Sequence, residues 1–472
     1  MINAYDEIAY ATGAFPQTHP DSLAAQALLF GLQPAPIGSC RVLEVGAGDG
    51  SNLIPMALGL PDAEFVGFDL AGDPVRRGIE VIEKLGLRNV RLFQADILDV
   101  DLGPRPFDYI IAQGVYSWTP DHVRAELMRL VGRLLAPDGV AYVSYNALPG
   151  GYVRLAVRHQ LLFETRDVVG RTARVEAAAG ALRGWPAPAV ATGTLQRAIA
   201  EEAAAMRGRS FSALAHDELS DAFHPVYLTD FAAQCAESSL RILTEAEPGE
   251  VGQWFAPPEI SDHEPFDALA RAQAADFAEA RLFHQSLVVR AEAPAARRPK
   301  VEAFASMHAS SNARRIGATR FEVAAVASFD LADPVLAAVL ERLASIWPAT
   351  APVPTLIQDG PRLLGLLELY GLRALELHAA PMTIALGERP RASPLARLQA
   401  EAGANKLTTL RHTMVEVDDA FSRGFIASLD GSQTRAELAM KVAPHFNLTP
   451  EAALAPVGVL LEVLARAPLL IG

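Results

Sequence analysis

The chain has 472 residues, half of them hydrophobic and 20% charged, a composition that excludes extensive disorder and allows about three domains. Its 41 basic and 55 acidic residues give a net charge of −14, which argues against sequence-independent binding of nucleic acid because such binding needs a basic surface. The two cysteines, Cys40 and Cys235, stand far apart and predict neither a disulfide framework nor a Cys-x-x-Cys metal site.

We expect neither a signal peptide nor a membrane-spanning segment in this sequence. Residues 1–7 lack the basic flank and apolar run of a signal peptide. The most apolar long window, residues 321–340, is interrupted by three acidic residues and Pro334, which a membrane span would not tolerate. We therefore expect a soluble, cytoplasmic protein with no membrane span.

Short apolar runs alternate with amphipathic stretches from residue 41 onward, which is typical of a parallel sheet with crossover helices. The sequence predicts five strands in this region, at 41–45, 65–68, 90–94, 109–112 and 141–144. Helices are predicted between them, at 51–60, 73–85 and 120–135. For the last helix we expect Thr119 as the N-cap and Pro120 at the first helical position.

Residues 151–236 are Ala- and Arg-rich with helical periodicity and predict a helical insertion. Two further strands, 240–244 and 286–290, flank a helical run at 265–280 and complete a seven-stranded sheet. We therefore expect an α/β fold in which residues 1–150 and 237–292 form one doubly wound, Rossmann-like core.

Two Pro- and Arg-rich segments, residues 293–300 and 387–394, read as linkers. They bound a mixed α/β middle domain at 293–390 and a small C-terminal domain at 391–472. Helices are predicted in the C-terminal domain at 419–428, 434–443 and 450–465.

The strongest motif is a glycine turn that follows the first strand and opens a helix. It has the form E-x-G-x-G-x-G, from Glu44 to Gly50, and its glycines allow close approach of a ligand to the backbone. A dinucleotide fingerprint would need a third glycine at position 51, which is Ser51.

Two more carboxylates end the neighbouring strands. Asp69 follows Gly46 by 23 residues, close to the ~20-residue spacing at which an acid reaches a ribose hydroxyl. Asp96 ends the third strand. Because ligands of open α/β sheets bind at the carboxyl ends of the strands, Glu44, Asp69 and Asp96 predict one nucleoside-binding cleft.

This glycine turn resembles motif I of the class I methyltransferases that use S-adenosylmethionine (SAM). The segments 5–7, 13–20, 107–118 and 139–146 are similar to bacterial methyltransferases that carry a methyltransferase regulatory domain. Outer-membrane-protein lysine methyltransferases belong to that group. The regulatory domain itself resembles residues 220–247 with 285–289, and the tail around residues 410–412 resembles the C-terminal winged-helix modules of relatives.

The resemblance implies SAM as the cofactor and places Asp96 on its adenine amino group. It implies these cofactor-binding residues: Gln17, His19, Glu44, Gly46, Ala47, Gly48, Asn52, Asp69, Leu70, Asp96, Ile97, Gln113, Gly114 and Val115. Residues that leave the fourth and fifth strands would meet the acceptor, so the catalytic candidates are Tyr116, Trp118 and Asn146. The two aromatic residues would serve equally well as core residues. The histidine spacing predicts no metal site.

The segment before the first strand, with Tyr10, Phe15, Gln17, Thr18 and His19, is predicted to fold over the cofactor as a lid. A lone histidine such as His19 is more often structural than a proton carrier.

The sequence is compatible with several classes of methyl acceptor. Methylation of an amine, with protein lysine favoured by the resemblance, needs a neutral nitrogen, and deprotonating a lysine at pH 7 costs roughly 4.6 kcal/mol. Desolvation can supply that shift without a dedicated base, and the Asn-Pro-Pro-Tyr motif of amino-group methyltransferases is absent. The alternatives are a methyltransferase acting on a small molecule or peptide natural product, and a non-catalytic SAM-binding regulator. The partner is thus a protein or small-molecule methyl acceptor, and a homodimer is one option for the assembly.

Overall fold

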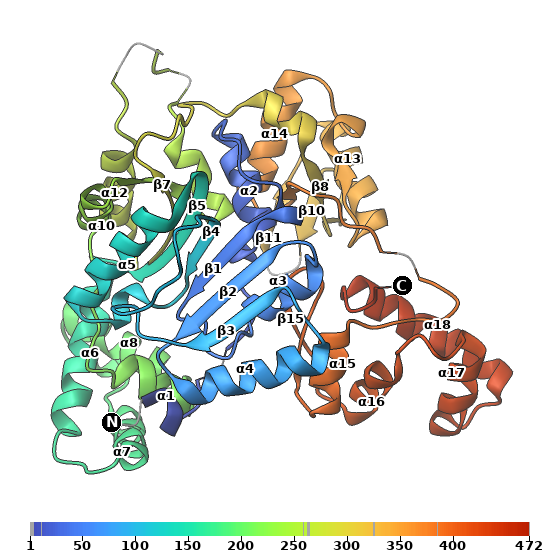
Figure 1. Cartoon of the computed structure of the whole chain (residues 1–472), viewed down its shortest axis with the longest axis horizontal. Coiled ribbons are helices and arrows are strands. Elements are labelled where there is room, and N and C mark those ends of the chain that lie inside the picture. Colours follow the sequence, from blue (N-terminus) through green and yellow to red (C-terminus); the bar gives the residue numbers. More distant parts are fainter. Residues whose placement is uncertain are drawn as a thin grey trace.

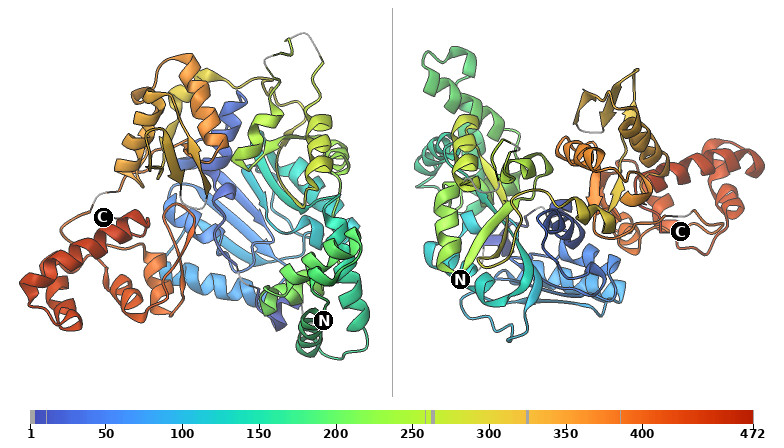
Figure 2. Two further views of the ribbon diagram at one scale, coloured as in Figure 1. Left: turned by 180° about the vertical axis from the view of Figure 1, so that it is seen from behind. Right: turned by 90° about the horizontal axis from the view of Figure 1, so that it is seen from above.

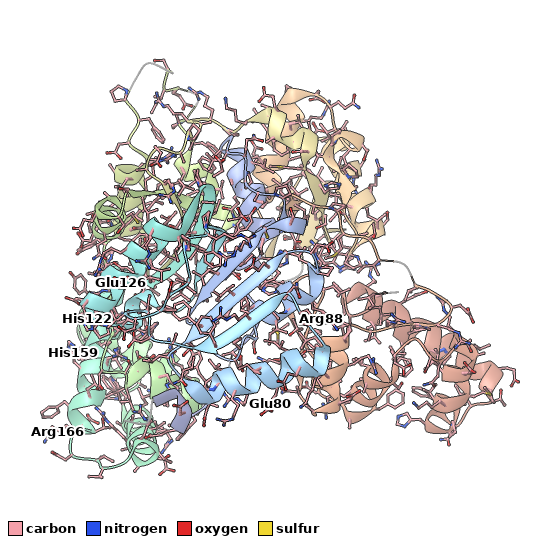
Figure 3. The ribbon with its side chains drawn as sticks, in the orientation of Figure 1. Glu80, Arg88, His122, Glu126, His159 and Arg166 are labelled. Atoms are coloured by element: carbon pink, nitrogen blue, oxygen red, sulfur yellow. The ribbon has the colours of Figure 1, made fainter. Side chains whose placement is uncertain are left out.

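A computed structural model describes residues 4–471, except residues 11, 258, 262–264, 324, 325 and 385. A central sheet with helices on its faces forms the body of the molecule, and a helical domain at the C-terminal end extends to one side (Figures 1 and 2). The outer faces of the flanking helices carry polar side chains such as Glu80, His122 and His159, all exposed (Figure 3).

The central sheet has seven strands in the order β3-β2-β1-β4-β5-β7-β6. Strands β1 to β5 run parallel, and β7 is antiparallel to both of its neighbours. Their bounds are β1 Arg41–Val45, β2 Glu64–Asp69, β3 Val90–Gln94, β4 Phe107–Ala112, β5 Leu135–Asn146, β6 Leu240–Glu245 and β7 Phe283–Arg290. The predicted doubly wound, Rossmann-like fold is confirmed, and β1 and β3 have the predicted bounds.

Strand β5 is longer than the predicted 141–144 because it follows α5 without a loop. Leu135 pairs with Phe107, and the register with β4 then shifts before Tyr109 meets Val140. That irregularity accommodates Pro137, Asp138 and Gly139, which are residues typical of turns.

The helices of the sheet domain are α1 Ala4–Glu7, α2 Pro20–Leu29, α3 Leu53–Gly59, α4 Gly72–Leu85, α5 Asp121–Leu134, α10 Leu228–Glu237, α11 Pro248–Val251 and α12 Ala268–Glu279. The predicted cap of α5 is wrong by one residue. Pro120 is the N-cap and makes no side-chain cap bond, while the Thr119 hydroxyl donates to the carbonyl of Tyr116 over 3.3 Å.

The insertion contains α6 Gly151–Glu164, α7 Arg171–Gly184, α8 Thr194–Met206, α9 Phe211–Ala213 and the π-helical turn Leu214–Glu218. These helices share a small core of their own, from Val157 to Leu219. Helix α10, which we predicted inside the insertion at 151–236, instead buries Leu228, Phe231 and Cys235 in the core of the sheet. Phe231 packs on Tyr145 of β5 with ring centroids 4.2 Å apart, and α10 also contacts β6, so α10 belongs structurally to the sheet domain.

The middle region contains α13 Pro334–Ile346 and α14 Gly360–Gly371. Its short strands are β8 His308–Ser310, β9 Arg314–Arg315, β10 Arg320–Val323, β11 Val326–Asp330, β12 Ala351–Pro352 and β13 Glu376–His378. They form the sheets β12-β8-β13 and β11-β10-β9. Leu340, Leu343 and Leu366 join the same hydrophobic core as the central sheet, so the middle region is packed onto the sheet domain.

The C-terminal domain has a separate core. Its elements are α15 Pro394–Glu401, β14 Lys406–Thr408, β15 Met414–Glu416, α16 Ala420–Ser428, α17 Arg435–Val442 and α18 Pro450–Arg466. Strands β14 and β15 form an antiparallel hairpin. Among the helices that the structure describes, none is by itself long and apolar enough to cross a membrane. Residues 435–446 and 450–466, which meet at an angle of 101°, are together long and apolar enough by length and composition only.

Candidate active site

The glycine turn lies at the carboxyl end of β1, between β2 and β4. The amides of Gly46 and Ala47 both donate to the carbonyl of Phe68 over 3.0 Å. Gly46, Gly48 and Gly50 have φ values of 71°, 55° and 72°, which favour glycine. A Cβ at Gly46 would lie 2.6 Å from Cγ2 of Val115, so the turn is in close contact with the loop after β4.

Glu44 lies near the end of β1, two residues before Gly46, and its carboxyl group is buried. The Nδ2 of Asn52 donates to Oε1 of Glu44 over 2.8 Å, whereas Oε2 of Glu44 is buried without a hydrogen-bond partner among the described residues. Burial raises the pKa of Glu44 to about 8, against the bond from Asn52. An unpartnered buried oxygen is costly, so this site is suited to a cationic donor.

Asp69 and Asp96 lie at the ends of β2 and β3, both half-buried. Asp69 accepts hydrogen bonds from the amides of Gly48 (2.9 Å) and Ala71 (2.8 Å). Burial raises the pKa of Asp69, and these two bonds oppose the rise. Asp96 accepts from the amide of Leu98 over 3.0 Å. All of these hydrogen bonds come from backbone amides and use only part of the lone pairs of the two carboxylates. Both acids can therefore accept further hydrogen bonds from a ligand.

Apolar residues follow these acids, with Leu70 exposed and Ile97 half-buried. The loop after β4 adds Gln113 and Gly114. The hydroxyl of Tyr142 donates to Oε1 of Gln113 over 2.6 Å, and the amide of Gly114 donates to Oγ of Ser144 over 2.8 Å. The structure therefore brings the cofactor residues predicted from four different strand ends to one edge of the sheet.

The N-terminal segment crosses the glycine turn, where the lid was predicted. The hydroxyl of Thr12 lies 2.9 Å from a carboxylate oxygen of Asp49, and the amide of Phe15 donates to Oδ1 of Asn52 over 3.0 Å. The side chain of Gln17 hydrogen-bonds Tyr142. The segment is thus attached to the turn and to β5.

His19 has a structural contact of its own. Its Nδ1 accepts from the amide of Asp21 over 3.1 Å and so caps α2. Burial lowers the pKa of His19, which favours the neutral ring that this cap requires.

His412 reaches the site from the C-terminal domain, and its contact with the glycine turn was not predicted from the sequence. Its Nε2 lies 2.8 Å from Oδ1 of Asn52, and its ring is 5.3 Å from that of His19. His412 is 360 residues from Asn52, so only the tertiary fold reveals this contact.

Of the acceptor candidates, one lies in the core, whereas Trp118 and Asn146 lie against Arg154 of the insertion. Tyr116 is fully buried, packs edge-on to Phe231 at 5.2 Å, and donates from its hydroxyl to Gln234. The structure therefore places Tyr116 in the core. Trp118 is half-buried and lines a cavity of about 500 Å³ between the sheet domain and the insertion. Further polar lining residues of this cavity are Glu7, Arg171, Arg174, His216 and Asp221.

Asn146 belongs to a buried polar group beside Trp118. Its Oδ1 accepts from Arg154 over 3.1 Å, and Arg154 also pairs with Glu218 at 2.8 Å. Arg154 and Arg158 lie 5.4 and 5.8 Å from the Trp118 ring. Sequence reasoning missed Arg154, Arg158 and Glu218, because they look like ordinary charges on amphipathic helices.

A second charged cluster lies at the adjacent ends of β6 and β7. His284 lies 3.2 Å from Glu245 and 2.9 Å from Asp276. Although Glu245, Glu250 and His284 offer ligand atoms within 4.8 Å of one another, Arg281 pairs with Glu250 and with Asp276. The guanidinium group supplies the positive charge that a metal ion would otherwise bring.

Three family models match this chain. The model described as a methyltransferase domain matches residues 38–168, the predicted methyltransferase regulatory domain matches 210–290, and the PKMT C-terminal winged helix domain matches 388–447. The chain therefore contains a methyltransferase domain and a methyltransferase regulatory domain, and it resembles the class I SAM-dependent methyltransferases that combine the two. The resemblances seen in the sequence, including that of the C-terminal tail, are confirmed.

Relatives and solved structures agree with this family. Two uncharacterized proteins of Rickettsia prowazekii (strain Madrid E) are 35% identical over 164 residues and 28% identical over 295 residues. These matches cover 35% and 61% of this chain, and the chain spans 66% and 52% of the two relatives. PKMT2 from Rickettsia typhi has the same fold, with a TM-score of 0.83, 21% identity, and coverage of 98% of this chain and 100% of that one. A structure of PKMT2 in complex with AdoHcy has a TM-score of 0.81.

Proposed function

We propose that this chain is a SAM-dependent methyltransferase whose acceptor is the amine of a protein lysine. The observation that carries the cofactor assignment is the buried Glu44 oxygen without a hydrogen-bond partner among the described residues, beside a turn whose three glycines have positive φ values. SAM carries an ammonium group and a sulfonium, so it fits a cleft whose strand ends present Glu44, Asp69 and Asp96. A pyrophosphate would be repelled by the carboxylates of Asp69 and Asp96.

The fit extends along the cleft. Glu44 and the glycine turn would hold the amino-acid end of SAM, Asp69 the ribose hydroxyls, and Asp96 with Ile97 the adenine. When bound, SAM supplies an electrophilic methyl group. The N-terminal segment, bonded to Asp49 and Asn52, would keep water out and fix the alignment that an in-line displacement requires.

The surroundings of Trp118 support an amine acceptor. A lysine that reaches this ring would be partly desolvated and would lie near the guanidinium groups of Arg154 and Arg158. Desolvation and like charge both lower the pKa of an amine, so the neutral nucleophile would form without a general base. The PKMT winged-helix match at 388–447 further supports a protein substrate.

A tRNA substrate has weaker support. A tRNA (guanine-N(7)-)-methyltransferase of Alcanivorax borkumensis is 31% identical over 116 residues, only 25% of this chain and 47% of that protein. The net charge of −14 does not favour binding to an RNA backbone.

The test is transfer of isotopically labelled methyl groups from SAM in the presence of a bacterial extract. We expect label in protein, recovered after hydrolysis as methylated lysine, and loss of labelling when the lysines of the extract are acetylated beforehand. Label in RNA or in small molecules would contradict the lysine assignment. Saturable SAM binding without transfer to any fraction would show a non-catalytic SAM-binding protein.

A further inference from the structure

The tip of the β14–β15 hairpin, residues Thr409–Thr413, is a compact turn held by its own polar groups. The amide of Thr409 donates to the carbonyl of Thr413 over 2.8 Å, and their hydroxyls are 2.7 Å apart. Thr409 Oγ1 also accepts from the amides of Arg411 and Thr413, each over 3.2 Å. These bonds fix the directions in which Arg411 and His412 leave the turn.

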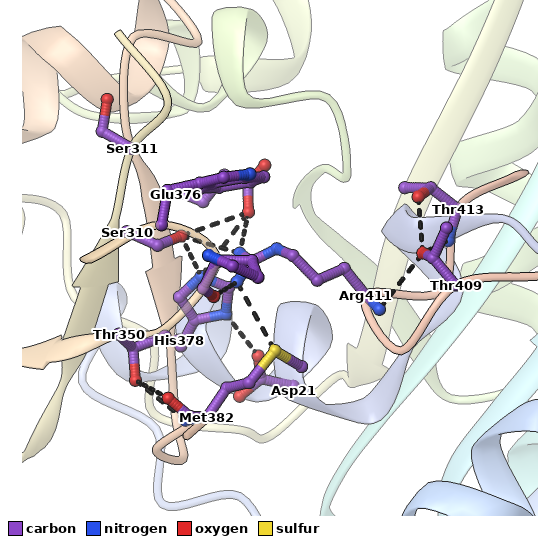
Figure 4. A network of polar contacts seen from close by, with 12 residues as sticks. Asp21, Ser310, Ser311, Thr350, Glu376, His378, Met382, Thr409, Arg411 and Thr413 are labelled. Carbon is purple, nitrogen blue, oxygen red and sulfur yellow. Dashed lines mark hydrogen bonds and ion pairs between the residues drawn. The ribbon is translucent and has the colours of Figure 1, made fainter. Parts of the chain in front are cut away.

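Arg411 attaches the tip to the middle region (Figure 4). Its guanidinium group donates to Ser310 over 2.7 Å and to the Pro348 carbonyl over 2.8 Å, and it pairs with Glu376. It also lies 4.5 Å from the centroid of the Trp347 ring. Although burial raises the pKa of Glu376, Arg411 and its neighbours hold that pKa at about 2. The pair is therefore ionised under all ordinary conditions.

The same network reaches the sheet domain. His378, beside Ser310 at 2.9 Å, pairs with Asp21 of α2 at 2.6 Å. Asp21 also accepts from the amides of Ala379 and Ala380, over 2.8 and 3.0 Å. The tip thus contacts a partly buried polar network that joins three parts of the chain.

His412 points the other way, into the cofactor site. It has a φ of 57°, a left-handed conformation uncommon for a residue with a side chain, and it is 4% exposed. Burial, aided by His19, lowers the pKa of His412 well below its usual value. The neutral ring can donate from Nε2 to Oδ1 of Asn52, which it approaches to 2.8 Å.

Asn52 connects His412 to Glu44 because its side-chain amide hydrogen-bonds both residues. An amide whose oxygen accepts from His412 and from the amide of Phe15 must direct its Nδ2 toward Oε1 of Glu44, where the bond is 2.8 Å. Reversing the amide would place its NH2 against the amide of Phe15, which can only donate, and would remove the acceptor of the bond from His412. The orientation of Asn52, and with it the free lone pairs of Glu44, is therefore set jointly by Phe15 of the N-terminal segment and by His412 of the C-terminal domain.

We infer that His412 is a positioning residue of the cofactor site, through which docking of the C-terminal domain completes the binding of SAM. The inference rests on the proposed SAM binding. By reciprocity, SAM in the cleft stabilises the docked position of the hairpin tip.

The test is the SAM dissociation constant of full-length variants, measured by calorimetry. His412→Ala is expected to weaken binding roughly tenfold, the effect of one buried hydrogen bond, and His412→Gln, which restores a donor, is expected to recover part of the loss. His445→Ala is the matched control, because His445 is an exposed residue of the same domain stacked on Phe421.

A double-mutant cycle separates positioning from a general loss of structure. If His412 acts through Asn52, the His412→Ala/Asn52→Ala variant binds SAM no more weakly than Asn52→Ala alone. The inference would be overturned if the double variant lost affinity by the product of the two single losses, or if His412→Ala bound SAM as tightly as the wild type. Either result would leave the proposed function standing. A wild-type chain that does not bind SAM would overturn both.

Hydrogen exchange of the wild-type chain gives a readout that needs no variant. SAM is expected to slow exchange of the amides of residues 409–413, which lie outside the cofactor-binding strand ends. Unchanged exchange at saturating SAM would contradict the coupling.

Discussion

Asn52 donates from Nδ2 to Oε1 of Glu44 over 2.8 Å, and the other carboxylate oxygen of Glu44 is buried with no hydrogen-bond partner among the described residues. Only one of the two oxygens of this carboxyl group therefore has a hydrogen-bond donor. Burial raises the pKa of Glu44 to about 8, against the bond from Asn52, and a cationic ligand would stabilise the ionised form.

The first prediction is a pH dependence of SAM binding. Glu44 is largely protonated below about pH 8, so binding of a cation must release that proton. We expect SAM affinity to rise with pH between 6 and 8, by up to tenfold per unit, and to level off above 8. Glu44→Gln should remove the slope, and Glu83→Gln, an exposed residue of α4, should retain it. An identical slope in Glu44→Gln would contradict this origin.

The second prediction concerns Gly78, whose position supports the glycine turn from α4. A Cβ on Gly78 would lie 2.4 Å from the backbone oxygen of Asp49 and from Cδ2 of Leu92. Gly78→Ala must therefore displace the turn, and we expect a loss of SAM affinity together with a lower melting temperature.

The control for this change is Gly59→Ala. Gly59 lies at the end of α3, and a Cβ there would meet nothing within 4 Å, so affinity and stability should stay within experimental error. If Gly78→Ala and Gly59→Ala had the same SAM affinity and the same melting temperature, the close approach of α4 to the glycine turn would not matter for SAM binding.

The third prediction is that Trp118 contributes to the acceptor side only. Trp118→Ala removes the ring that lines the cavity beside Arg154. We expect the KM for the acceptor to rise by roughly tenfold, as for loss of a buried aromatic contact, with no change in the SAM dissociation constant. Phe163→Ala, an exposed aromatic of the insertion, should alter neither. A change in SAM affinity alone would place Trp118 in the cofactor site instead.

The fourth prediction concerns the stability of the β6–β7 cluster. Burial lowers the pKa of His284, but Glu245 and Asp276 override it and raise the pKa to about 10. A group whose pKa is raised on folding contributes stability that is complete below its unfolded pKa, about 6.5, and is lost as the pH rises toward 10. The difference in melting temperature between wild type and His284→Gln should therefore narrow from pH 7 to pH 10.

The matched control for that experiment is His122→Gln, an exposed histidine of α5 (Figure 3). It should leave the melting temperature unchanged across the same pH range. A wild-type advantage over His284→Gln that stays constant with pH would mean that the ring acts by packing rather than by charge.

The sheet and its cofactor edge could be predicted because their signals are local. Apolar runs define β1 and β3 to the residue, and a parallel sheet then brings Glu44, Asp69 and Asp96 to one edge whatever the packing. The family resemblance of the glycine turn supplied the ligand, and the matched methyltransferase domain agrees with it.

The remaining features depend on tertiary contacts. The sequence could not show whether Tyr116 faces the cleft or the core, because an aromatic residue after a strand fits both. The role of His412 was also hidden, since a single histidine in a hairpin carries no signal until the fold places it 2.8 Å from Asn52. Helix α10 was assigned to the insertion because its sequence resembles that of the preceding helices, although its apolar face packs on the sheet.

The most direct test of the central claim is a calorimetric titration of the full-length chain with SAM, in parallel with a nicotinamide dinucleotide. We predict one saturable site for SAM, none for the dinucleotide, and loss of the SAM site in Asp69→Ala but not in Asp62→Asn, an exposed residue outside the cleft. Binding of the dinucleotide, or no binding of SAM at saturating concentration, would contradict the account.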